Sequence, residues 1–93
     1  MITVNVIGSS MEPHIKNGDL LHFKSVNKID EIAEKDIVLC NHPYIKNLQI
    51  IKRVKKIVNG RFFVIGDNVR SFESSDSRSF GLLPLSKIIG KLN

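Results

Sequence analysis

The sequence predicts an all-β or β-rich domain. Short apolar runs rich in β-branched residues recur along the chain, Asn-Gly pairs mark turns between them, and no segment with a helical pattern is longer than about two turns. The chain has 93 residues, of which 42% are hydrophobic. That length suits one compact core and is too short for two. We therefore expect a single domain over residues 1–93.

The first half of the chain predicts three strands. Residues 2–7 alternate between two faces, which is typical of a half-buried strand. Asn17-Gly18 is a turn signal and leads into a second strand over residues 20–26. Residues 28–35 are expected to form one or two helical turns, and residues 36–40 a buried third strand.

The second half predicts a long hairpin, a loop and a final apolar segment. Residues 48–58 are rich in β-branched side chains and should be extended. Asn59-Gly60 then closes a hairpin into residues 61–65. Residues 66–79 contain five serines and are expected to be a long loop, which in so small a domain is usually functional or disordered. Residues 82–89 form the last apolar segment.

Hydropathy and cysteine content bear on where such a chain works. No uninterrupted apolar run exceeds four residues, whereas a membrane-spanning helix needs about 20. The N-terminus has no basic segment followed by an apolar signal core. The lone Cys40 cannot form an internal disulfide, which fits a reducing compartment. We expect a soluble, cytoplasmic chain with no transmembrane segment.

The net charge of +5 is concentrated in the second half of the chain. Residues 45–93 hold ten Lys and Arg against three acids. Such a surface is either a solvated basic face or a binding face for nucleic acid, a membrane or an acidic protein. The four basic residues Arg53, Lys55, Lys56 and Arg61 are not interleaved with the aromatic residues that single-strand binders use for stacking. Nucleic-acid binding by a catalytically inactive domain nevertheless stays open as an alternative.

The stretch Gly-Ser-Ser-Met-Glu-Pro at residues 8–13 places two serines where the first strand ends. A serine hydroxyl is a poor nucleophile until a base removes its proton, and a lysine can be that base only when it is neutral. Lys52 is a candidate, because strand alternation puts it on one face with Ile50 and Val54. The alternatives are a turn role for Ser10 and a snorkelling role for Lys52, whose stem would cover apolar surface.

Four ordered stretches give these residues a family context. They are Ser10-Met11-Glu12-Pro13 with Gly18-Asp19, Asp36-Ile37-Val38, Ile51-Lys52-Arg53-Val54, and Gly66-Asp67-Asn68 with Asp76-Ser77-Arg78 and Gly81. Together they resemble the conserved boxes of the type I signal peptidases, a family of serine endopeptidases with a Ser/Lys pair. The resemblance implies a small mixed, β-barrel-like catalytic core, with Ser10 as the nucleophile and Lys52 as its base.

Within this family the chain resembles a small branch, the nickel-type superoxide dismutase maturation proteases. The resemblance lies in Ser-Met-Glu-Pro, in Asn41-His42-Pro43 and in the stretch of residues 75–81. It implies removal of an N-terminal extension from the precursor of nickel superoxide dismutase, which would be the protein partner. A generic signal peptidase acting on another precursor is the alternative within the family.

The resemblance also assigns supporting roles. The backbone N–H of Ser10 would stabilise the oxyanion, while Gly8 has no side chain to offer as a second donor. Ser9, Met11 and Pro13 would shape the site. Ser74, with Ser75 as its competitor, would orient Lys52, and Asp76 would form an ion pair with Arg78. The remaining expectations concern a tight turn at Gly66, Asp67 and Asn68, a non-catalytic His14, and the absence of a metal or cofactor, since Cys40 and His42 alone do not make a metal site.

Overall fold

The computed structural model describes residues 1–71 and 75–93 of the chain. Within these residues one sheet has the strand order β1-β2-β7-β3-β4-β5-β6. Its strands are β1 (Ile2–Asn5), β2 (Leu20–Ser25), β3 (Ile37–Asn41), β4 (Gln49–Val58), β5 (Arg61–Ile65), β6 (Leu83–Pro84) and β7 (Ile88–Leu92). The short helical turns are η1 (Ile29–Glu31), α1 (Ser77–Phe80) and η2 (Leu85–Lys87). The prediction of a β-rich fold is confirmed.

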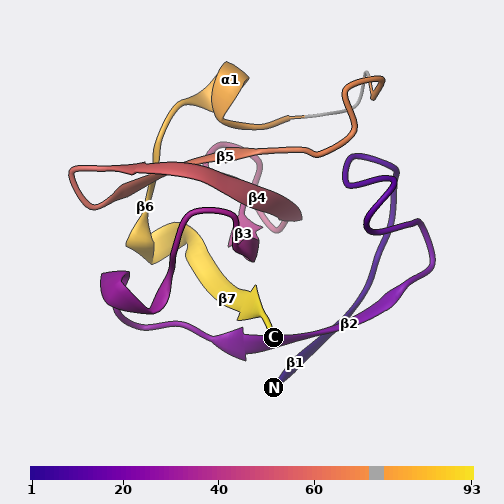
Figure 1. The fold of residues 1–93 in the computed structure, drawn as a ribbon, viewed down its shortest axis with the longest axis horizontal. Helices are drawn as coiled ribbons and strands as arrows, with labels where there is room; N and C mark the ends of the chain where they lie inside the picture. The colour runs from indigo at the N-terminus through magenta and orange to yellow at the C-terminus, as the bar shows by residue number, and fades with distance from the viewer. Residues whose placement is uncertain (72–74) are drawn as a thin grey trace.

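The sheet curls, so that β4 and β5 lie across the core from β1 and β2, with β3 and β7 between them (Figure 1). All strand pairs of the described residues are antiparallel, which corrects the expectation of a mixed sheet. The physical reason is the connections: the β1–β2, β3–β4 and β4–β5 pairs are consecutive strands joined by turns and loops, whereas parallel neighbours need a long crossover.

The hairpin of β4 and β5 is the longest regular feature of the fold. Asn59 and Gly60 turn the chain with φ angles of 50° and 74°, the left-handed region that a two-residue hairpin turn requires. β4 pairs with β3 on one side and β5 on the other, and is therefore a central strand. The predicted extended segment and its hairpin are confirmed.

Three predicted segments differ from the structure. β1 ends at Asn5 rather than at residue 7, because the chain turns away once Val6 has entered the core. The helical turns expected over residues 28–35 are reduced to η1, and the N–H groups of the two residues before it, Asn27 and Lys28, donate to the Glu31 carboxylate. The loop of residues 66–79 contains the start of α1, whose N-cap is Asp76. Four-residue helices are too short to produce a periodic pattern.

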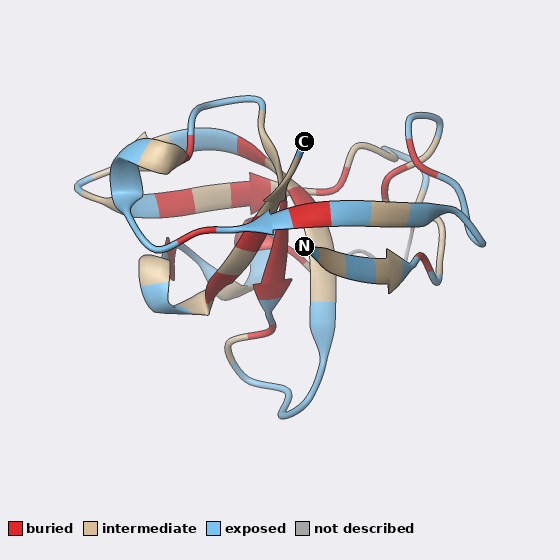
Figure 2. Cartoon of the chain, turned by 90° about the horizontal axis from the view of Figure 1, so that it is seen from below, coloured by how far each residue is buried: buried red, intermediate tan, exposed pale blue. Residues whose placement is uncertain are grey.

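The core divides into two clusters. The larger one gathers side chains of the central strands, including Val38, Cys40, Val54, Phe62 and Val64. The smaller one joins Val6, Met11 and Ile15, from the segment that follows β1. Figure 2 shows buried positions concentrated along the strands and exposed ones along the connecting loops. The second cluster matters for function, because it holds the serine stretch against the sheet.

Gly90 shows why β7 needs a glycine where it crosses β2. A Cβ atom at this position would lie 2.7 Å from the Lys24 carbonyl oxygen and 3.2 Å from the Phe23 Cβ. Both neighbours belong to β2, which pairs with β7 at Ser25 and Gly90. The absence of a side chain therefore lets the two strands approach.

Across residues 1–71 and 75–93, no helix is long and apolar enough to span a bilayer.

Candidate active site

A cavity of about 660 Å³ opens beside the serine stretch. One wall is the end of β1 with the segment that follows it, and the opposite wall is the first half of β4 with the turn before it. Ser10 and Lys52 both line this cavity, as does Ser75. The fold thus brings the two residues predicted to be catalytic to one hollow, although they lie on segments far apart in the sequence.

The serine stretch is held by backbone geometry on both sides of Ser10. Gly8 has a φ of 96°, in the left-handed region, and its N–H donates a 2.9 Å hydrogen bond to the Asn17 Oδ1. After the serines, the Ile15 N–H donates to the Met11 carbonyl oxygen at 3.0 Å. Met11 is buried in the smaller core cluster, while Pro13 is exposed. Met11 therefore anchors the turn that presents Ser9 and Ser10.

Lys52 is a buried lysine in the middle of a central strand. Only 4% of its surface is exposed, and it lies opposite Val38 on β3. Burial lowers the pKa of its amine, and this effect outweighs the nearby Asp76 and Cys40, which raise it; Arg78 lowers it further. The alternative of a snorkelling lysine with a solvated amine does not fit this exposure.

Cys40 is a buried, unreactive neighbour of this amine. Burial raises the pKa of its thiol to about 12, although the charge of Lys52 opposes the rise. The thiol is therefore neutral near neutral pH, and the negative charge by which it raises the pKa of Lys52 exists only at strongly alkaline pH. Among the described residues, no group of three His, Cys, Asp or Glu side chains is placed to hold a metal ion.

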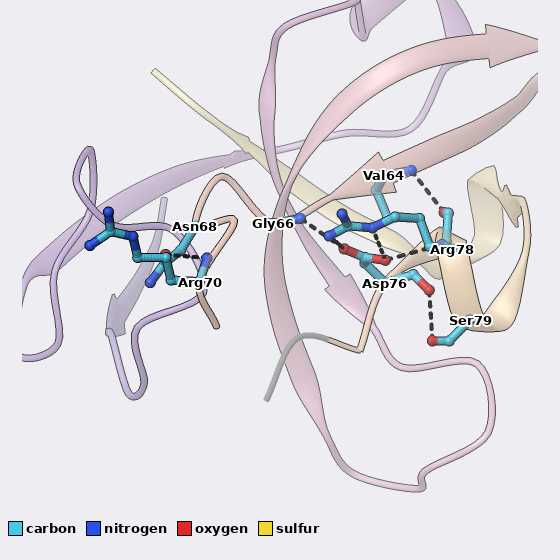
Figure 3. A network of polar contacts seen from close by, with 8 residues as sticks. Val64, Gly66, Asn68, Arg70, Asp76, Arg78 and Ser79 are labelled. Carbon is cyan, nitrogen blue, oxygen red and sulfur yellow. Dashed lines mark hydrogen bonds and ion pairs between the residues drawn. The ribbon is translucent and has the colours of Figure 1, made fainter. Parts of the chain in front are cut away.

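Asp76 organises the loop that leads back toward the cavity. It is 2% exposed, and its carboxylate accepts hydrogen bonds from the Gly66 N–H at 3.1 Å and from the Arg78 N–H at 3.0 Å. The Arg78 guanidinium forms an ion pair with it at 2.6 Å (Figure 3). The Ser79 hydroxyl donates to its carbonyl oxygen at 3.0 Å. The ion pair expected between Asp76 and Arg78 is thus present in the structure.

The residues expected to form a tight turn after β5 have a different task. The expected position of the turn is corrected, because neither Gly66 nor Asn68 has a positive φ and the hydrogen-bonded turn starts at Asn68, whose carbonyl oxygen accepts from the Ser71 N–H at 3.2 Å. Instead, the Asn68 N–H donates to the Ser10 carbonyl oxygen at 2.8 Å, and its Nδ2 donates to the Ser9 carbonyl oxygen at 2.9 Å. Asn68 therefore ties this loop to the serine stretch.

Asp67 joins a second network that sequence reasoning missed. Its carboxylate accepts from the Arg53 Nε at 2.8 Å and lies 3.0 Å from the His14 Nδ1. Burial raises the pKa of Asp67, but the hydrogen bond and charge of Arg53, aided by His14, outweigh burial and hold it below its usual value. Arg53 also donates to the Lys35 carbonyl oxygen at 2.8 Å. No local pattern links these residues, because they meet only in the folded sheet.

The predicted partner of Lys52 is partly outside the described residues. Ser74 belongs to residues 72–74, which the structure does not describe. Ser75, its competitor, lines the cavity and forms a 2.9 Å hydrogen bond with the His42 Nε2. Sequence reasoning treated His42 as part of the resemblance to the maturation proteases and as half of an unsuitable metal pair, and gave it no role in the site. The signal that could have singled it out is a histidine directly after a buried strand.

The comparison with known families agrees with this arrangement. The model of the signal peptidase family, peptidase S26, matches residues 1–56 and 55–93. A comparison with curated proteins gives no significant match. The two family matches together span the chain. The chain therefore belongs to the signal peptidase family, peptidase S26.

Proposed function

We propose that the chain is a Ser/Lys serine endopeptidase that removes the N-terminal extension of a nickel superoxide dismutase precursor in the cytoplasm. The observation that carries the proposal is the burial of Lys52 beside a cavity that Ser10 also lines. A dry amine with a lowered pKa is the form of lysine that can accept a proton from serine. The choice of substrate rests on the resemblance to the nickel-type superoxide dismutase maturation proteases, which lies in Ser-Met-Glu-Pro, Asn41-His42-Pro43 and residues 75–81.

The chemical steps follow from these two groups. The Ser10 Oγ attacks the substrate carbonyl carbon while its proton passes to the Lys52 amine. The resulting oxyanion is stabilised by the Ser10 N–H, and each such donor contributes about 3 to 4 kcal/mol. The C–N bond then breaks, and the Lys52 ammonium returns the proton to the leaving amine. Water then attacks the ester carbonyl carbon while its proton passes to the Lys52 amine, the C–O bond to Ser10 breaks, and the Lys52 ammonium returns the proton to the Ser10 Oγ.

A second oxyanion donor must come from somewhere other than residue 8. Gly8 has no side chain, and its N–H is already engaged by the Asn17 Oδ1 at 2.9 Å. Stabilisation of the oxyanion therefore depends more heavily on the Ser10 N–H than in relatives that carry a side-chain hydroxyl at the position of Gly8. Ser9 shapes this turn through its carbonyl oxygen, which accepts from Asn68.

The walls of the cavity favour an uncharged, extended substrate segment. Lys52 is the one ionisable side chain among the described lining residues, and its working form is the neutral amine. The remaining lining is apolar or neutral, and it includes Val4 and Ile7 on one side and Gln49 and Ile51 on the other. Two strand-like walls of this kind suit a neutral peptide in an extended conformation. This supports a precursor segment as the substrate over a charged ligand.

Incubation with two precursors tests the proposal. One is the nickel superoxide dismutase precursor with its N-terminal extension, and the other is a presecretory protein with an ordinary signal peptide. Wild type should shorten the first, with the new N-terminus read by mass spectrometry, and Ser10→Ala and Lys52→Ala should leave it intact. Ser25→Ala and Lys55→Ala, at exposed positions, are the matched controls.

The other outcomes separate the alternatives. Cleavage of the presecretory protein alone would support a generic signal peptidase. Cleavage of neither precursor, together with DNA binding that weakens steeply with salt, would support an inactive basic domain. The buried Cys40 thiol fits a reducing compartment, which supports the cytoplasmic location.

A further inference from the structure

His42 is a buried histidine that belongs to neither of the proposed catalytic groups. It follows β3 directly, and its N–H donates to the Leu48 carbonyl oxygen at 2.8 Å. The Phe80 ring packs edge-on against its imidazole, with ring centroids 5.2 Å apart. Only 7% of the residue is exposed. The ring is therefore held in one orientation by contacts from two sides.

The hydrogen bonds of the ring identify its tautomer. The Nδ1 atom accepts from two backbone N–H groups, those of Tyr44 at 3.1 Å and Ile45 at 3.0 Å. An atom that accepts cannot also carry a proton, so in the neutral ring the proton is on Nε2. The Nε2–H then donates to the Ser75 Oγ at 2.9 Å. The direction of the His42–Ser75 hydrogen bond follows from the chain around it.

His42 thereby holds the Ser75 hydroxyl directly. The residue that follows Ser75 in the chain, Asp76, is itself buried and bound to Gly66 and Arg78. A hydroxyl has one proton to donate and two lone pairs. With one lone pair occupied by His42, the other and the proton remain for the cavity, which Ser75 shares with Lys52.

We propose that His42 is a positioning residue that acts through Ser75 on the Lys52 amine. The inference rests on the proposed function, because it assigns a role in that same reaction. A neutral amine has one lone pair, which must face Ser10 for proton transfer, and two N–H groups that need acceptors elsewhere. A hydroxyl oxygen held still by His42 gives one N–H a preferred partner. The amine then spends more of its time in the reactive orientation.

Two substitutions separate this role from a structural one. In His42→Asn the side-chain oxygen can replace Nδ1 and hold the turn at Tyr44 and Ile45, but no donor reaches Ser75. In His42→Gln the amide nitrogen can replace Nε2 and donate to Ser75, but no acceptor remains for the turn. If His42 positions Ser75, kcat should be higher in the variant that keeps the donor, His42→Gln. If the role of His42 is structural, kcat should be higher in the variant that keeps the turn, His42→Asn.

The experiment measures kcat, KM and thermal unfolding with the precursor that wild type cleaves. We expect His42→Asn and Ser75→Ala each to lower kcat by roughly 10- to 100-fold with little change in KM. We expect their combination to cost little more than either alone, because both break one link. His42→Gln should retain more kcat than His42→Asn although it melts earlier. His22→Asn, at an exposed position, is the matched control.

The results that would overturn the inference are distinct from those that would overturn the proposed function. If wild type cleaves no precursor, both fall. If wild type cleaves and His42→Asn keeps full kcat, or if the two single losses multiply in the double variant, the inference alone falls. Nitrogen-15 spectra of the imidazole give a check that needs no substrate, because a proton on Nδ1 of His42 would contradict the proposed direction of the hydrogen bond.

Discussion

The backbone N–H of Asn68 donates a 2.8 Å hydrogen bond to the carbonyl oxygen of Ser10. The Asn68 side chain adds a second bond to the Ser9 carbonyl oxygen, at 2.9 Å. Two loops that are remote in sequence are thus joined beside the cavity. Asn68 thereby binds both carbonyl groups, which holds the peptide planes on either side of the Ser10 Cα; the first of these planes contains the Ser10 N–H.

Asn68→Ala should remove both side-chain bonds, the one to the Ser9 carbonyl oxygen and the one from the Arg70 N–H, and leave the backbone bond to Ser10. We expect the free energy of unfolding to fall by about 0.5 to 1.5 kcal/mol, since the Ser9 carbonyl oxygen loses the Asn68 donor but keeps the Glu12 N–H at 3.1 Å. We also expect a lower kcat, because the Ser10 N–H becomes less well oriented. Urea unfolding and precursor cleavage measure the two effects, with Asn27→Ala, at an exposed position, as the control. Unchanged stability and rate would show that the side-chain bonds are dispensable.

Lys52→Met should abolish cleavage and change the pH dependence of stability. Because the pKa of Lys52 in the folded chain lies below its ordinary value of 10.5, the unfolded chain binds more protons between those two pKa values. Wild type should therefore gain stability relative to Lys52→Met as pH rises through that window. Unfolding at a series of pH values measures the difference, with Lys55→Met as the control. A difference independent of pH would contradict the lowered pKa.

The same shift predicts the alkaline dependence of wild-type cleavage. Activity should rise with pH, because only the neutral amine can accept the serine proton, and the midpoint should fall below pH 10.5. A profile of kcat/KM against pH reports this value for the free enzyme. A rate that declines as the amine loses its proton would exclude Lys52 as the base.

Asp76→Asn should move that midpoint to lower pH. The Asp76 carboxylate raises the pKa of Lys52, so removing its charge lets burial lower the pKa further. The variant also loses an acceptor for the Gly66 N–H or the Arg78 N–H, which should cost about 1 kcal/mol or more of stability. Asp30→Asn, at an exposed position, is the control. A midpoint that stays in place would mean that Asp76 acts on the fold alone.

Asp67→Asn should remove part of the acid sensitivity of the fold. The pKa of Asp67 is held below 3.8 in the folded chain, so its contribution to stability is present above that pH and is lost as pH falls through the folded pKa. The stability difference between wild type and Asp67→Asn should shrink below pH 3.8. Chemical unfolding between pH 7 and acid conditions measures it. A constant difference would argue against the Arg53 pairing.

Gly90→Ala should destabilise the chain without touching the cavity. The added methyl group would meet the Lys24 carbonyl oxygen at 2.7 Å, and β2 and β7 would have to separate. Overpacking of this kind costs about 1 to 3 kcal/mol. Thermal unfolding measures the loss, with Lys87→Ala as the control. A variant as stable as wild type would show that β7 can shift to make room.

Strand patterns in the sequence were sufficient to predict most of the strands of the sheet. Alternation over the first residues correctly places Val6 inside and Ile7 outside, and the Asn59-Gly60 pair correctly predicts the hairpin. Alternation also places Lys52 on the face of Val54, and both residues are buried. These features depend on neighbours in sequence, which is why a single chain reveals them.

Contacts between distant segments were not predictable in this way. The bonds of Asn68 to the serine stretch, of Asp67 to Arg53 and of His42 to Ser75 each join loops or strands that only the folded sheet brings together. The polar residues that make them look like ordinary loop residues in the sequence. The helical turn at α1 was missed for a related reason, since its signal is one capping carboxylate, Asp76.

The strand order places Ser10 and Lys52 in parts of the sheet that differ in local stability. The segment bearing Ser10 follows β1, a four-residue strand at one end of the sheet, whereas Lys52 belongs to a ten-residue strand paired on both sides. Fraying begins where backbone pairing is thinnest, so mild heating or low denaturant should detach the nucleophile while the base stays in place. Loss of cleavage would then precede the spectroscopic melting of the sheet, and cooling would restore it.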